Sequence, residues 1–202
     1  MPRLAITVLI IFFTLGFGLR SLIHWRRTGT SGFKGISGAA GSAEWVGGVL
    51  FVVALVCIVA APLGQLRGWL SPWPALDGPI AHAAGMVLCA VGIASTLWAQ
   101  LAMGNSWRVG LDASERTALV ASGPFGLVRN PIYTSMLLGM AGVALLVPNW
   151  MAAVAMATLL AALELQVRRV EEPHLLRVHT ASYRAYAART GRFLPGIGRI
   201  AA

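Results

Sequence analysis

The chain has 202 residues, of which 57% are hydrophobic and only 11% are charged. Because an average soluble domain carries about 25% charged residues, this composition excludes a soluble globular protein. The formal net charge is +9, which in a soluble protein would suggest nucleic-acid binding. In a membrane protein, basic residues instead follow from topology and from attraction to anionic lipids. We therefore expect a membrane protein with no nucleic-acid partner.

The charged residues leave four long uncharged stretches. A membrane-spanning helix requires about 20 mostly apolar residues, so three of the stretches each hold one helix. The fourth is divided by Pro148 and Asn149, because proline ends or turns a helix. The sequence predicts an all-α polytopic membrane protein with about five spanning helices, over residues 4–23, 45–63, 79–101, 131–147 and 151–167, the last two forming a tight hairpin (131–167).

Basic residues are distributed unevenly between the predicted loops. The segments after the first, third and fifth spans hold 14 of the 16 Lys and Arg residues, and the other segments hold Arg3 and Arg67. Cytoplasmic loops carry the excess of basic residues, so we expect the N-terminus outside and the C-terminus in the cytoplasm. Cys57 and Cys89 lie inside apolar spans without a His or Cys cluster, which indicates neither a disulfide nor a metal site.

The segments that follow the third and fifth spans are charged and aromatic, so we expect any chemistry to lie there. In the first of them, Asn130 precedes Pro131 at the start of a span. Proline suits the first turn of a helix, and asparagine is a common N-cap. A helix N-terminus offers free N–H groups to a carboxylate or a phosphate.

The last segment predicts a cytoplasmic amphipathic helix over residues 173–190, lying on the membrane or against the core. Its apolar face is expected to carry Leu175, Val178, Ser182 and Tyr186. Glu171 and Glu172 suit the first turn of this helix, where negative charge is favourable. Glu164 lies late in a span, where an ionisable group is costly, and its simplest partner is Arg168, one turn further on.

Three short blocks in this half of the chain resemble the isoprenylcysteine carboxyl methyltransferase family and related membrane methyltransferases. They are Leu119-Val120 with Gly123-Pro124-Phe125 and Arg129-Asn130-Pro131-Ile132-Tyr133; residues 168–172; and Tyr183 and Tyr186 with Phe193-Leu194-Pro195. The resemblance implies a polytopic enzyme that binds S-adenosylmethionine on the cytoplasmic side, with a lipophilic acceptor that enters from the bilayer. It also implies that residues 1–97 are N-terminal membrane helices and a linker, and residues 98–202 the methyltransferase core.

The resemblance also assigns residues to a site. It implies a cofactor pocket formed by Leu119, Val120, Phe125, Asn130, Pro131, Tyr133 and Glu171, with Glu172 as the neighbouring carboxylate. The family places an arginine just before the glutamates against the acceptor, which is Arg168 here, or Arg169. Two positions depart from the family pattern: Asn130 replaces the usual histidine, and His179-Thr180 replaces the usual Phe-Gly. Asparagine keeps a donor and an acceptor but carries no charge.

The chemistry of the residues agrees with this resemblance. Methyl transfer from a sulfonium needs no metal and depends mainly on orienting two reactants. Phe125 and Tyr133 can face the sulfonium through cation–π contact, and Glu171 can bind amino or ribose groups. A carboxylate acceptor is ionised at neutral pH, so Arg168 could hold it without a general base. An amine or thiol acceptor would instead require a proton acceptor, Glu172 or water.

We therefore predict an S-adenosylmethionine-dependent methyltransferase whose preferred acceptor is an isoprenylcysteine-like carboxylate. An isoprenoid acid, a phospholipid amine or a hydrophobic thiol fits the same description, and the expected partners are this acceptor and membrane lipids. Two other classes stay open. An NADPH-dependent enzyme like the sterol reductases would need extra basic residues for the 2′-phosphate. A non-catalytic scaffold or small transporter would place ionisable groups face to face at mid-membrane depth, and the central parts of these spans have none.

Overall fold

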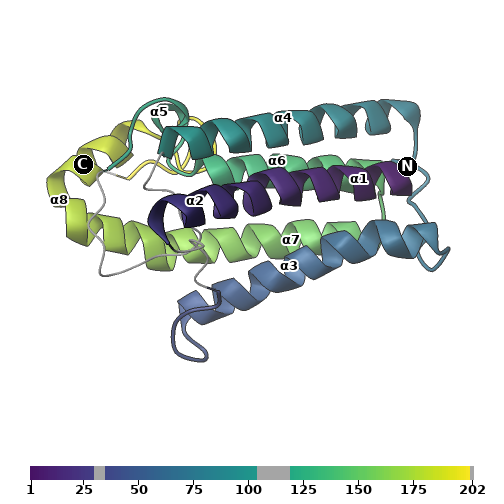
Figure 1. Cartoon of the computed structure of the whole chain (residues 1–202), viewed down its shortest axis with the longest axis horizontal. Helices are drawn as coiled ribbons and strands as arrows, with labels where there is room; N and C mark the ends of the chain where they lie inside the picture. The colour runs from purple at the N-terminus through teal and green to yellow at the C-terminus, as the bar shows by residue number, and fades with distance from the viewer. Residues whose placement is uncertain (30–34, 104–118, 201–202) are drawn as a thin grey trace.

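The computed structural model describes residues 1–29, 35–103 and 119–200, and the regular elements in these ranges are helices. Figure 1 shows the long helices side by side in an elongated bundle, with the N-terminus at one end and the C-terminus at the other. In chain order the elements are α1 (Pro2–Phe13), η1 (Thr14–Leu19), α2 (Arg20–Thr28), α3 (Ala43–Leu66), α4 (Pro79–Met103), α5 (Pro124–Leu127), α6 (Pro131–Leu146), α7 (Trp150–Gln166), η3 (Val167–Glu171) and α8 (Glu172–Arg189).

The apolar helices confirm the predicted all-α membrane fold. Four helical runs are long and apolar enough to cross a membrane: Pro2–Arg26, Ala43–Leu66, Pro79–Met103 and Trp150–Arg189. The shorter apolar helix α6 has 16 residues, and α7 has 17. At 1.5 Å per residue each is about 25 Å long, which matches the expected hairpin of two short spans. The protein is a multi-pass membrane protein, and α8 continues the last run beyond α7.

Local capping explains where the helices begin. Ser42 precedes α3, and its hydroxyl accepts the Trp45 N–H at 3.2 Å. Asn149 precedes α7, and its side-chain oxygen accepts the Ala152 N–H at 3.1 Å. The amide nitrogen of Asn149 also donates to the Ala61 carbonyl at 3.3 Å. Asn149 therefore starts α7 and at the same time attaches the α6–α7 turn to α3, which confirms the predicted hairpin.

The helices α4 and α6 pack with their backbones in contact. A Cβ atom on Gly92 would lie 2.7 Å from the Gly139 nitrogen, and one on Gly142 would lie 2.7 Å from the Gly85 carbonyl oxygen. Small residues allow this close approach between membrane helices. The helix α3 packs against α7 in a second pair, and α1 contacts α3 and α6.

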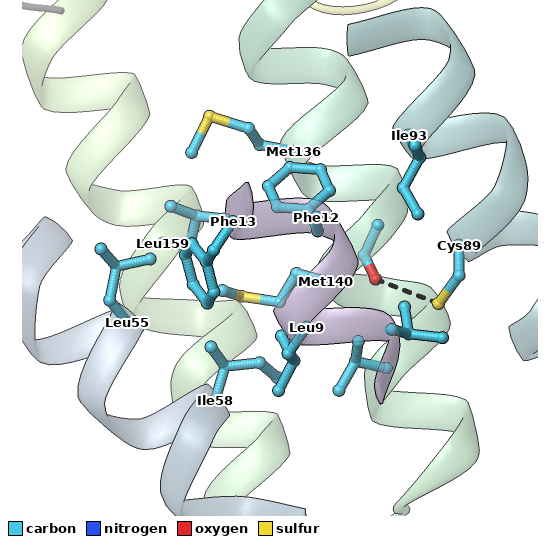
Figure 2. Close-up of a pocket in the computed structure, with 13 residues that line it drawn as sticks. Leu9, Phe12, Phe13, Leu55, Ile58, Cys89, Ile93, Met136, Met140 and Leu159 are labelled. Atoms are coloured by element: carbon cyan, nitrogen blue, oxygen red, sulfur yellow. Dashed lines mark hydrogen bonds between the residues drawn. The ribbon is translucent and has the colours of Figure 1, made fainter. Parts of the chain in front are cut away.

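A small apolar cavity lies where these helices meet. Its volume is about 30 Å³, and its lining includes Phe12, Phe13, Met136, Met140 and Leu159 (Figure 2). A buried water needs roughly 10–15 Å³ of such space and polar partners, and the lining of this cavity is almost entirely apolar. Cys89 borders it and donates to the Gly139 carbonyl at 3.7 Å. This cavity therefore offers few groups for chemistry.

The last helical run differs from the prediction. We expected a new helix to start near Pro173, but α7 continues through the π-helical segment η3 into α8. The Glu172 N–H binds the Val167 carbonyl, five residues back. Proline has no N–H to donate and clashes with the preceding turn of an α-helix, and a π turn widens the helix locally. Pro173 is thus accommodated within the run instead of starting it.

The predicted apolar face of the C-terminal helix is also wrong in part. Ser182 is exposed, while Tyr183 joins Tyr186 in the buried set. The cause is a kink at Thr180, whose φ of 30° and ψ of −98° lie outside helical geometry. The kink changes the direction of the helix after residue 180, so a single helical period does not describe both halves of α8.

Candidate functional site

The charged, aromatic segments that follow the third and fifth predicted spans meet at one end of the bundle, through residues 125–130 and 186–192. The Arg129 N–H donates to the Gly191 carbonyl at 2.8 Å, and the Asn130 N–H donates to the Arg192 carbonyl at 3.1 Å. The Tyr186 hydroxyl donates to the Phe125 carbonyl at 2.6 Å. We call residues 119–134 and 171–198 together the polar junction. Figure 1 shows α5 and α8 at this end, opposite the N-terminus.

Tyr133 and Glu171 form a close pair in the polar junction. Tyr133 lies in the first turn of α6, and Glu171 is the last residue of η3. The Tyr133 hydroxyl donates to Glu171 Oε1 at 2.6 Å, and both side chains are half-buried. A carboxylate and an aromatic ring at one partly open position can face a cationic ligand.

Glu172 is held by two arginines. Arg129 Nη2 donates to Glu172 Oε1 at 2.6 Å, and Arg192 donates through Nε and Nη2 to the two carboxylate oxygens, each at 2.9 Å. Burial alone would raise the pKa of Glu172, but the hydrogen bonds from Arg192 and Arg129 outweigh it and lower that pKa below its usual value. A carboxylate in this state is a poor proton acceptor, so the geometry favours a positioning role. The catalytic role predicted for Glu172 stays a prediction.

Arg129 connects α6 to the C-terminal segment. Its Nη1 donates to the carbonyls of Ala187, at 3.1 Å, and Thr190, and its Nη2 donates to the Gly198 carbonyl at 2.8 Å. We did not predict a role for Arg129 or for Arg192. Arg129 did stand in the Arg-Asn-Pro block that carried the resemblance, whereas nothing in the sequence pairs Arg192 with a glutamate 20 residues away.

Asn130 precedes α6 as predicted, but its side chain does not cap the helix. Its amide nitrogen donates instead to the Arg192 carbonyl at 3.2 Å. The backbone of Asn130 has φ −123° and ψ 61°, and this conformation accompanies the bond that its N–H makes to the same carbonyl. Pro131 is buried at the first position of α6. The next N–H groups of the helix have no partner within it and are suited to an anion.

Aromatic residues form the wall on the α8 side. Tyr183, Tyr186 and Ala187 are buried together, and Leu119 packs against them. The rings of Tyr183 and Tyr186 are 6.0 Å apart with an interplanar angle of 65°, a favourable edge arrangement. Burial raises the pKa of Tyr186 to about 12, so its hydroxyl stays protonated as a donor. Phe125 is also buried, and its backbone carbonyl accepts the Tyr186 hydroxyl.

Two predicted site residues are not joined to this network. Val120 is half-buried, and its apolar side chain takes no part in the hydrogen bonds that join Arg129, Tyr133 and the two glutamates. Arg168 forms the expected ion pair with Glu164, and its side chain is 57% exposed. Arg169 is exposed as well. The contact of Arg168 or Arg169 with an acceptor therefore stays a prediction. Arg108 and Arg116, counted in the same basic segment as the junction, lie outside the described residues.

The loop after α3 and the turn between α6 and α7 lie at the same end of the bundle, as expected if the chain crosses the membrane an odd number of times. The Trp73 N–H donates to the Pro148 carbonyl at 2.6 Å, so the loop after α3 meets the α6–α7 turn at the end opposite the polar junction.

Within residues 1–29, 35–103 and 119–200, no group of three or more His, Cys, Asp or Glu could hold a metal ion. The side-chain groups at the junction that can bind a ligand include aromatic rings, carboxylates and guanidinium groups.

A comparison with known families decides the class of this protein. A model of the phospholipid methyltransferase family matches residues 80–182, about half of the 202 residues. The chain belongs to this family. The predicted relation to membrane methyltransferases of the isoprenylcysteine carboxyl methyltransferase type is thereby confirmed. No curated protein matches the chain.

The match includes most of the site of this membrane methyltransferase. Residues 80–182 contain Tyr133, Glu171 and Glu172 together with Arg129 and Asn130. The family supports a methyltransferase over the reductase and scaffold alternatives. The matched region ends before the C-terminal segment that carries Arg192.

Proposed function

We propose that this membrane methyltransferase transfers a methyl group from S-adenosylmethionine to a lipophilic acceptor at the polar junction. The observation that carries the proposal is the hydrogen bond between Tyr133 and Glu171. It joins the start of α6 to the end of η3, two elements inside the family match. The sequence resemblance implies an acceptor that is a membrane lipid or a lipidated molecule and that reaches the site from the bilayer.

The residues of the junction suit the charged groups of S-adenosylmethionine, the methyl donor. Tyr133 and Glu171 present an aromatic face and a carboxylate, which suit the sulfonium and amino groups. The N–H groups of the first turn of α6 and the side chain of Asn130 suit the carboxylate. When bound, the cofactor supplies an electrophilic methyl carbon. The protein contributes by orienting the two reactants, an effect that can lower a barrier by about 7 to 11 kcal/mol.

For the acceptor we propose first an isoprenylcysteine-like carboxylate. A carboxylate requires no proton acceptor, and this suits a site in which both oxygens of Glu172 are already bound by arginines. Arg168 and Arg169, both exposed just before the glutamates, are the residues that we propose to bind such a group. Guanidinium groups bind carboxylates through a planar fork.

A phospholipid amine is the second candidate, because the matching family model describes phospholipid methyltransferases. An amine must lose a proton before or during transfer. Glu171, which accepts the Tyr133 hydroxyl, is then the candidate proton acceptor, because the lowered pKa of Glu172 makes that carboxylate a poor one. Tyr133 would orient that carboxylate through their hydrogen bond.

We also propose that the junction faces the cytoplasm and that the N-terminus lies outside. The support is the excess of basic residues in the segments after the first, third and fifth spans, which follows the positive-inside rule. S-adenosylmethionine is made in the cytoplasm, so this orientation would give the cofactor direct access. The lipophilic part of the acceptor would approach from the side, through the bilayer.

A transfer assay with methyl-labelled S-adenosylmethionine tests the function and separates the acceptors. Purified protein in nanodiscs is incubated with a farnesylated cysteine peptide or with phosphatidylethanolamine in the bilayer. A carboxyl methyl ester releases labelled methanol in alkali, whereas an N-methyl group is stable. Alkali-labile label on the peptide supports the first acceptor, and stable label in the lipid supports the second. No transfer to either, with no binding of labelled S-adenosylmethionine, would contradict the proposal.

A further inference from the structure

We infer that the C-terminal segment 190–198 is part of the working site and that Arg192 is its positioning residue. This inference rests on the proposed function. The family match ends at residue 182, and the sequence resemblance includes Phe193-Leu194-Pro195 but gives Arg192 no role. The structure nevertheless places the segment between the two elements that carry Asn130 and Glu171.

The backbone of the segment is joined to the start of α6 at consecutive residues. The Gly191 and Arg192 carbonyls accept the N–H groups of Arg129 and Asn130. One residue further on, the Thr134 hydroxyl donates to the Phe193 carbonyl at 2.8 Å. The Phe193 ring is buried in the main core of the bundle. The segment therefore follows the start of α6 over three residues and is anchored in the membrane domain by an aromatic side chain.

The side chain of Arg192 reaches in the other direction, to the start of α8. Its two bonds to the Glu172 carboxylate are a bidentate contact, the arrangement in which arginine holds a carboxylate most firmly. The carbonyl of the same residue holds both the N–H and the side-chain amide of Asn130. Arg192 thus connects the predicted cofactor residue Asn130 to the glutamate next to Glu171.

Gly191 shows that this connection tolerates little change. A Cβ atom at this position would lie 2.0 Å from the Leu194 carbonyl oxygen and 2.8 Å from the Gly196 nitrogen. Both are backbone atoms, which cannot move aside as a flexible side chain can. Only glycine lets the segment turn back on itself here, and the turn directs the Arg192 side chain toward Glu172.

Arg192 is expected to act on the cofactor through its neighbours. If Arg192 is shortened, Glu172 loses its bidentate partner and keeps the bond from Arg129, and the residue whose carbonyl holds Asn130 loses its side-chain connection to α8. Glu171 is next to Glu172 in the chain, and Tyr133 lies one helical turn after Asn130. Loss of Arg192 should therefore weaken cofactor binding more than it changes the rate at saturating cofactor.

The test uses the full chain in nanodiscs and three variants: Arg192→Gln, Arg192→Lys and the control Arg199→Gln. Arg199 lies next to this segment in the chain and is exposed. We expect Arg192→Gln to raise the KM for S-adenosylmethionine about tenfold with a smaller change in kcat, which corresponds to about 1.4 kcal/mol. Arg192→Lys, which keeps the charge and part of the contact, should recover part of the loss. Arg199→Gln should stay close to the unmodified protein.

A measurement without substitution covers the case in which Arg192→Gln does not fold. Hydrogen exchange of the unmodified protein, with and without S-adenosylmethionine, should show added protection in peptides over residues 190–198. The loop 67–78 at the opposite end is the control and should not change. Cofactor binding without that protection, or Arg192→Gln with an unchanged KM, overturns the inference alone. Failure of the unmodified protein to bind the cofactor contradicts the proposed function, and the inference fails with it.

Discussion

Two ion pairs on the same helical run differ in burial, since one is exposed and the other is buried. Glu164 pairs with Arg168 on the surface, where the arginine side chain is 57% exposed. Two turns further on, Glu172 pairs with Arg129 and Arg192, and the side chains of Glu172 and Arg129 are only 8% and 2% exposed. The first pair is local, one turn of helix apart. The second joins three segments that are distant in sequence.

The difference in burial indicates which of the two ion pairs stabilises the site. An exposed ion pair contributes little, because water screens the charges and competes for the hydrogen bonds. A buried pair that loses one partner leaves an uncompensated charge in a low-dielectric place, which is strongly destabilising. The junction therefore depends on Glu172, whereas Glu164 mainly neutralises charge at the end of a span.

The largest expected effect is that of Glu172→Gln. This variant keeps the shape of the side chain but leaves Arg129 and Arg192 without their carboxylate. We expect it to lower the free energy of unfolding by about 3 to 5 kcal/mol, the range for a broken buried pair. Titration with sodium dodecyl sulfate, followed by helical circular dichroism, measures the change. A loss below about 1 kcal/mol would show that the pair is no more important than a surface contact.

The pH dependence of stability sharpens the same comparison. The pKa of Glu172 is lowered in the folded protein, because its bonds to Arg192 and Arg129 outweigh the effect of burial. A carboxylate of this kind contributes stability above its unfolded pKa, about 4.3, and loses that contribution as the pH falls through the folded pKa. We expect the melting temperature to fall on acidification below about pH 4.3, and to fall less in Glu172→Gln. Equal slopes for the two proteins would contradict the lowered pKa.

A smaller effect, of opposite sign, is expected at Thr180. The kink there turns α8, after which the chain runs through Tyr183 and Tyr186 to Arg192, and the threonine adopts φ 30°, which costs a non-glycine residue about 1 to 3 kcal/mol. Thr180→Gly should relieve this strain and stabilise the protein by about 1 kcal/mol. The control is Ala181→Gly, at a position in regular helix, which should destabilise the protein by about 1 kcal/mol. Destabilisation by both variants would show that Thr180 is not strained.

The smallest expected effect is that of Glu164→Gln. An exposed pair one helical turn apart contributes about 0.3 to 0.5 kcal/mol, so unfolding should change by no more than this. Binding of S-adenosylmethionine should change little, because the Glu164 carboxylate is bound by the exposed Arg168 and takes no part in the pair of Tyr133 and Glu171. Both quantities are measured in parallel with Glu172→Gln. A loss comparable to that of Glu172→Gln would remove the distinction between the two pairs.

The sequence predicted what is encoded locally. Apolar runs located the spans, Pro148 and Asn149 located the hairpin, and the spacing of Glu164 and Arg168 indicated their pair. The resemblance to known methyltransferases added Tyr133 and Glu171, which the structure joins by a hydrogen bond. Each of these features depends on neighbours a few residues apart or on a short motif.

The rest depends on how the chain folds back on itself. Arg129 and Arg192 meet Glu172 across 43 and 20 residues, and no periodicity encodes such a pairing. The continuity of α7 into α8 was missed because proline usually starts or ends a helix, and a π turn at η3 accommodates it here. The kink at Thr180 was missed for a related reason, since the helical period was extended across a residue that is not helical.

Binding of S-adenosylmethionine to the purified protein tests the central claim most directly. Isothermal titration should show one cofactor bound per chain for the unmodified protein and for the control Arg168→Gln, which removes an exposed side chain outside the junction. Glu171→Gln, Tyr133→Phe and Asn130→Ala should each weaken binding, with Glu171→Gln the most affected because it loses a charge. An unmodified protein that binds no cofactor, or variants that bind as tightly as it does, would contradict a methyl-donor site between α6 and η3.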